Sequence, residues 1–176
     1  MSLLGAPFTS SQSPPKALHK RVQLINTAID TRQYMLAARQ ADRLVWRIMA
    51  EYDINPECVL CLRQLGAYAR FLDGHYGCAA HESLELARAW ALKGDYTQAT
   101  DDLVRAASAW LHMPDSDDAR HLGYVLLAAW DRTPSPARTP GLMRRRYRAQ
   151  IEHRISALTH RLQRLPRRGC ELASIY

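Results

Sequence analysis

Residues 74–93 read GHYGCAAHESLELARAWALK, residues 94–113 read GDYTQATDDLVRAASAWLHM, and residues 114–133 read PDSDDARHLGYVLLAAWDRT. Each line opens on turn-forming residues and closes soon after an Ala-Trp pair. Five positions per line are spaced by three, four, three and four residues: Tyr76, Ala79, Ser83, Leu86 and Trp90; Tyr96, Ala99, Leu103, Ala106 and Trp110; Ser116, Ala119, Gly123, Leu126 and Trp130. Such spacing marks one face of an α-helix. The stretch therefore predicts three similar helices in succession.

The same spacing extends toward the N-terminus. Three further stripes, each a set of mainly apolar residues at steps of three and four, have this spacing: Leu18, Val22, Ile25 and Ile29; Tyr34, Ala37, Ala41, Leu44 and Ile48; Cys58, Cys61, Leu65, Tyr68 and Leu72. Gly74 and Gly94 stand where one helix must end and the chain reverse, because glycine adopts left-handed backbone angles without steric cost. Short loops make sequential helices antiparallel. The sequence therefore predicts an all-α fold of stacked antiparallel helix hairpins, with about seven helices.

Composition divides the chain into segments around this repeat. Residues 1–15 are rich in Ser, Thr and Pro and predict a disordered N-terminal segment, followed by a helical-repeat domain over residues 16–132. Residues 133–140 carry three prolines and predict a linker. Residues 141–166 predict a basic amphipathic helix that packs on the domain or extends it, and residues 167–176 a tail. No segment has the apolar length of a transmembrane helix or the pattern of a secretory signal, so we expect a cytoplasmic protein.

One thirty-residue part of the repeat has a recognisable order of residue types. A large apolar residue, a small residue and an aromatic are followed by Gly-x-Tyr-x-x-Ala, then by a second large apolar residue and an Ala. The matching residues are Leu86, Ala87, Trp90, Gly94, Tyr96, Ala99, Leu103 and Ala106. Residues 83–111 thereby resemble one tetratricopeptide repeat. The resemblance implies a groove that receives a peptide or helix of a partner protein, with Tyr76, Trp90, Tyr96 and Trp110 as candidate contacts.

Charge is concentrated at the C-terminal end. Residues 132–176 hold 11 Arg against two acidic residues, Glu152 and Glu171, whereas residues 1–131 hold 13 Lys and Arg against 15 Asp and Glu. A bias of 21 Arg to 3 Lys is also typical of GC-rich bacterial coding. The candidate anion contacts on the last predicted helix are Arg144, Arg145, Arg148, Arg154, Arg161 and Arg164. Three interpretations stay open: a cap on the helical stack with solvated arginines, nucleic-acid binding through phosphates, or contact with a second copy, an acidic partner or an anionic membrane.

A second alternative is a small zinc-binding module. Cys58-x-x-Cys61 is followed after sixteen residues by Cys78-x-x-His81, an acceptable zinc-ligand spacing. Antiparallel helices would, however, place the two pairs at opposite ends of a hairpin, about 20 Å apart at 1.5 Å per residue. We therefore expect neither metal nor other cofactor.

The chain contains no motif that predicts a reaction. It has no glycine-rich phosphate loop, no Ser nucleophile elbow and no paired-carboxylate motif. We therefore expect a non-enzymatic adaptor or chaperone that binds another protein, with the arginine-rich helix as a nucleic-acid alternative.

Overall fold

The computed structural model describes residues 16–51, 56–134 and 141–164, without the side chains of residues 16, 17, 51, 141–143 and 164. The predicted N-terminal segment 1–15, the linker beyond Pro134 and the tail 167–176 lie outside the described residues. The helices are α1 (Lys16–Asp30), α2 (Tyr34–Glu51), α3 (Pro56–Leu72), α4 (Tyr76–Leu92), α5 (Tyr96–His112), α6 (Asp117–Arg132) and α7 (Gly141–Arg164). This described part contains no strand, so the predicted all-α class is confirmed.

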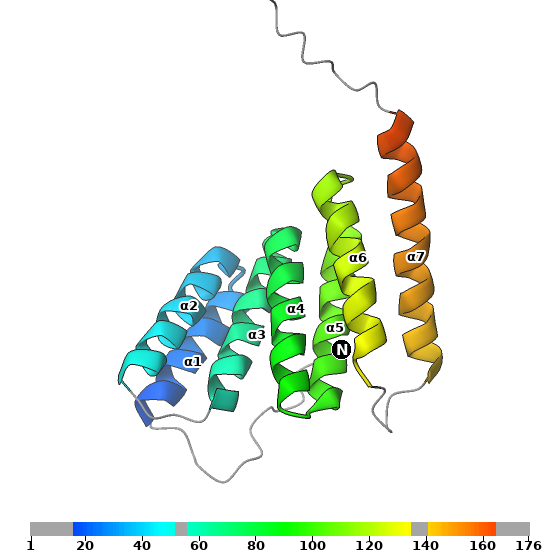
Figure 1. Ribbon diagram of the computed structural model, residues 1–176. Helices are drawn as coiled ribbons and strands as arrows, with labels where there is room; N and C mark the ends of the chain where they lie inside the picture. The colour runs from blue at the N-terminus through cyan, green and yellow to red at the C-terminus, as the bar shows by residue number, and fades with distance from the viewer. Residues whose placement is uncertain (1–15, 52–55, 135–140, 165–176) are drawn as a thin grey trace, which may run out of the picture.

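The helices stand side by side in chain order, from α1 and α2 at one end of the stack to α7 at the other (Figure 1). Each of the first six packs against the next along the chain, and α7 packs on α6. In the C-terminal half α4 also contacts α6, and α5 contacts α7, so alternate helices there form two layers. This is a repeat-like arrangement of antiparallel hairpins.

Three interhelical turns share one backbone geometry. The middle residue of each has a positive φ angle: 60° at Arg32, 82° at Gly74 and 78° at Gly94. The next amide donates to the carbonyl five residues earlier, at 2.7, 2.9 and 3.0 Å respectively, which is the longer bond of a Schellman motif. The two predicted glycine turns are confirmed, and a third places a non-glycine residue in the same conformation.

The repeat positions form the core. In all three lines the four positions after the first are buried, including the tryptophans. One core joins α4 to α7 and includes Trp110, Trp130 and Ile155. A second joins α1, α2 and α3. A small cluster of Leu60, Leu86, Trp90 and Ala99 lies between them and connects α3 to α4 and α5.

The predicted stripe of α3 is wrong. Tyr68 is 45% exposed, and Cys58, Cys61, Leu65 and Leu72 are only partly buried. The buried positions are Leu60, Leu62, Gly66, Ala67 and Ala69. The reason is that α3 packs between α2 and α4 and therefore buries two sides rather than a single stripe.

Candidate functional site

The four aromatic residues predicted to contact a partner have different environments. Trp90 and Trp110 are buried, and the indole N–H of Trp110 donates to the Ala119 carbonyl at 2.6 Å. Tyr76 is half-buried, with its ring centroid 5.6 Å from that of Phe71. Tyr96, at 38% exposure, is the most accessible of the four. The two tryptophans therefore stabilise the stack, and only the tyrosines reach the surface.

The four residues of the predicted zinc set are not brought together. Cys58 and Cys61 lie in the first turns of α3, and Cys78 and His81 lie in the first turns of the next helix, α4. Within the described part of the chain, no three His, Cys, Asp or Glu side chains are grouped so that they could hold a metal ion. Burial raises the pKa of the Cys61 thiol, and Cys58 and Glu57 raise it further. This disfavours the thiolate that ligation or nucleophilic attack requires.

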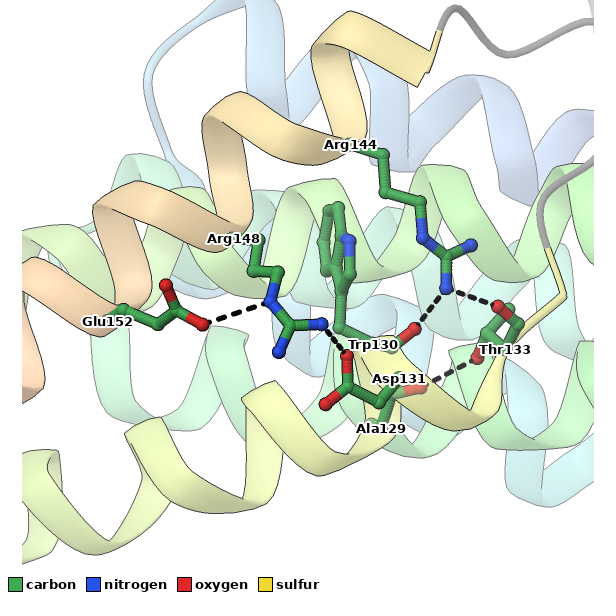
Figure 2. Close-up of polar contacts among 7 residues, drawn as sticks. All are labelled: Ala129, Trp130, Asp131, Thr133, Arg144, Arg148 and Glu152. Carbon is green, nitrogen blue, oxygen red and sulfur yellow. Dashed lines mark hydrogen bonds and ion pairs between the residues drawn. The ribbon is translucent and has the colours of Figure 1, made fainter.

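Arg144 and Arg148 of α7 hold the C-terminal end of α6 (Figure 2). Arg144 donates to the carbonyls of Trp130 and Thr133 at 2.5 and 2.6 Å. Arg148 pairs with Asp131 and donates to Glu152 of its own helix at 2.9 Å. Carbonyls in the last turn of a helix lack intrahelical partners and carry partial negative charge. Arg144 therefore acts as a C-cap supplied by another helix.

Arg154 makes the same contact with α5. Its guanidinium donates to the carbonyls of Trp110 and Met113, lies 4.6 Å from the Trp110 ring centroid, and is 3.6 Å from a carboxylate oxygen of Asp115. Arg161 pairs with the same Asp115. Burial lowers the pKa of Arg154, and Asp115 opposes that shift.

The two caps occupy equivalent positions of the twenty-residue repeat. Trp110 and Met113 of one line correspond to Trp130 and Thr133 of the next. Four of the six candidate anion contacts, Arg144, Arg148, Arg154 and Arg161, thus bind α5, α6 or their adjoining residues. Arg145 is exposed and makes no hydrogen bond or ion pair with any described residue, whereas the side chain of Arg164 lies outside the described set.

Sequence reasoning missed a surface on α2. Trp46 is 74% exposed, Met49 66% and Leu36 44%, and the guanidinium-bearing residues Arg39 and Arg43 are exposed beside them. We name these five residues the α2 outer face. Leu36, Arg39, Arg43 and Trp46 follow steps of three, four and three residues on the side opposite the buried stripe. This spacing is present in the sequence, but a stripe with two arginines at its centre does not have the apolar pattern by which buried faces are recognised.

A buried acidic residue joins α5 to α3. Asp102 is fully buried and accepts hydrogen bonds from Gln64 of α3 at 2.7 Å and from Arg105 at 2.6 Å. Burial raises the pKa of Asp102, whereas the bonds from Gln64 and Arg105 lower it. Both partners of the Asp102 carboxylate, the Gln64 amide and the Arg105 guanidinium, belong to the stack, so this network is a structural link between α3 and α5.

A shallow, open pocket of about 360 Å³ lies between α6 and α7. Tyr124, Glu152 and His160 line it, but Glu152 is already bonded to Arg148. No hydrogen bond links a nucleophile to a base there, so the pocket has no assembled catalytic pair among the described residues.

Comparison of the chain with models of known protein families, with curated proteins and with solved structures found no match. None of the helices in the described ranges combines the length and hydrophobicity needed to cross a bilayer.

Proposed function

We propose that this chain is a non-enzymatic, cytoplasmic interaction module of the tetratricopeptide-repeat type, acting as an adaptor or chaperone that binds a peptide or helix of a partner protein. The observation that carries the proposal is a set of large apolar side chains left exposed on a closely packed stack. Trp46, Met49, Leu92 and Tyr124 are all more than half exposed, although the chain buries three other tryptophans. Exposed aromatic and apolar groups on a rigid scaffold are typical of protein interfaces.

The order of helices supports the same proposal. A stack of antiparallel hairpins presents extended outer faces whose side chains are fixed by the helices beneath them. Binding to such a surface needs little ordering of the scaffold, so less of the interaction energy is lost to conformational entropy.

Affinity purification from the native lysate, with and without nuclease, tests this function. The tagged full chain should retain a protein in stoichiometric amount, and nuclease should leave it bound. The tag alone is the control. Recovery of nucleic acid alone, lost on nuclease treatment, would overturn the proposal in favour of the arginine-rich alternative.

A further inference from the structure

The α2 outer face combines exposed apolar side chains with exposed arginines along one stripe, and the outer faces of α4 and α6 differ from it in how their charges are paired. On α4 the exposed arginine Arg88 is paired with Glu85, so Leu92, one turn further along, lies beside an arginine whose charge is already neutralised. On α6 Asp131 is paired with Arg148. On α2, Leu36, Arg39, Arg43 and Trp46 follow one another along a single stripe, and Met49 continues it. Apolar and cationic groups are thus interleaved over about 20 Å of helix at 1.5 Å per residue.

The positive charge of this face is not neutralised within the described part of the chain. Neither Arg39 nor Arg43 forms an ion pair or hydrogen bond with a described residue. The nearest carboxylate along α2, that of Asp42, is bonded to Arg70 of α3 at 2.5 Å. On α7, by contrast, Arg144, Arg148, Arg154 and Arg161 bind groups of the stack, which leaves Arg145 and Arg146 as its arginines without a partner among the described residues.

Trp46 differs in the same way from the other tryptophans. Trp90, Trp110 and Trp130 are buried in the repeat, whereas Trp46 lies off the buried stripe of α2. The exposed side chain of Trp46 therefore does not serve the packing of the stack. An exposed tryptophan beside arginines has the composition of an interface hot spot, where both residue types are enriched.

We propose that the α2 outer face binds an acidic amphipathic helix of the partner protein. This inference rests on the proposed function and names the partner's chemistry. Trp46, Met49 and Leu36 would pack against the apolar side of that helix, while Arg39 and Arg43 pair with its carboxylates. A linear ridge with steps of three and four residues matches the side-chain rows of another helix. Charge complementarity fixes the register and excludes basic helices.

Two other classes of partner fit this surface less well. A helix that lies on a membrane keeps its centre apolar and its charges at the edges, but here Arg39 and Arg43 lie between Leu36 and Trp46 on the stripe. Phosphate recognition would use the arginines and leave Met49 and Leu36 without a role.

Trp46 provides a local probe, because it is the one exposed tryptophan of the four, all of which are described. Acrylamide quenching of the full chain therefore reports mainly on the α2 outer face. The titrants are a synthetic peptide of about the 18 residues of α2, with a leucine face flanked by glutamates, and the same peptide with lysines in place of the glutamates. Vesicles of phosphatidylcholine and phosphatidylserine and a single-stranded oligothymidylate complete the set.

The glutamate peptide should shield Trp46 from acrylamide, and the lysine peptide should not. Trp46→Ala, followed by labelled-peptide anisotropy, should weaken binding at least about tenfold. Arg39→Glu with Arg43→Glu should do the same, and the milder pair Arg39→Gln with Arg43→Gln should weaken binding less without reversing charge.

Matched controls are Leu92→Ala for the apolar change and Arg145→Glu with Arg146→Glu for the charge reversal; each should change affinity less than about twofold, as expected of residues outside the contact.

Equal binding of both peptides, unchanged affinity of Trp46→Ala, or shielding by vesicles or oligothymidylate alone would overturn the assignment. If the glutamate peptide does not shield Trp46 while the purification still yields a stoichiometric protein, the α2 assignment fails and the proposed function stands. If the purification yields no protein partner, the proposed function itself fails.

Discussion

Gly123 shows how a single missing methyl group sets the distance between helices. A Cβ atom there would lie 2.6 Å from Cζ2 of Trp110 and 2.9 Å from Cγ1 of Ile155, both in the buried core. Gly123→Ala should lower the free energy of unfolding by about 1–3 kcal/mol through overpacking, even though alanine favours the helix. Urea denaturation measures this. Gly77→Ala, where the added Cβ meets only Met113 at 3.5 Å, is the control and should cost nothing.

Arg32 occupies the left-handed position that glycine fills in the two equivalent turns. Its φ angle is 60°, against 82° and 78° at Gly74 and Gly94. Arg32→Gly should therefore stabilise the chain by about 0.5–1 kcal/mol, because relief of the left-handed strain exceeds the added freedom of the unfolded state. Thermal unfolding would show a higher Tm. The reverse change Gly94→Ala, with no neighbour within 4 Å of the new Cβ, isolates the backbone cost and should lower Tm; a rise would contradict this account.

At the scale of elements, α7 is fastened through its arginines as much as through its apolar side. Arg154→Leu would remove the guanidinium donor from the carbonyls of Trp110 and Met113 and the cation from the Trp110 ring, although the Trp110 carbonyl keeps its bond from the Met113 amide. We expect a loss of about 1.5–3 kcal/mol in urea unfolding, the range for hydrogen bonds to charged groups. Arg154→Lys should recover only part, since lysine cannot bridge both carbonyls and stack. Arg145→Leu, at an exposed site where the arginine bonds to no described residue, should stay within about 0.5 kcal/mol of the parent.

The link between α3 and α5 should make stability depend on pH. Burial raises the pKa of Asp102 above the ordinary value of 3.8. As pH rises, the unfolded chain therefore loses the Asp102 proton at a lower pH than the folded state does. Stability is thus lost as pH rises from about 4 through the folded-state pKa. The free energy of unfolding of the parent minus that of Asp102→Asn should fall as pH rises over this window. Asp118→Asn, at an exposed site in the first turn of α6, should not show this fall; the same slope in both would refute the assignment to Asp102.

At the scale of the whole molecule, the sequence predicted those features that depend on periodicity. The positions Ala79, Leu86 and Trp90 and their equivalents are buried as their spacing indicates. The failure at Tyr68 arises because α3 is covered from two sides, which a single stripe cannot represent. The caps by Arg144 and Arg154 depend on which carbonyls another helix brings within reach, and spacing within one helix carries no such information.

Two cores within one stack imply that a small joining cluster controls cooperativity. Leu86 is fully buried there, with Leu60 of α3 and Ala99 of α5, whereas Leu126 lies inside the core of α4 to α7. Either leucine replaced by alanine should cost about 2–5 kcal/mol. In a repeat array, stability is a sum of unit and interface terms, so weakening the interface lets the halves unfold separately. Leu86→Ala should therefore broaden the urea transition and lower its apparent m value, whereas Leu126→Ala should shift the midpoint and keep m. An unchanged m for Leu86→Ala would mean that the two cores unfold as one unit through other contacts between α3 and α4.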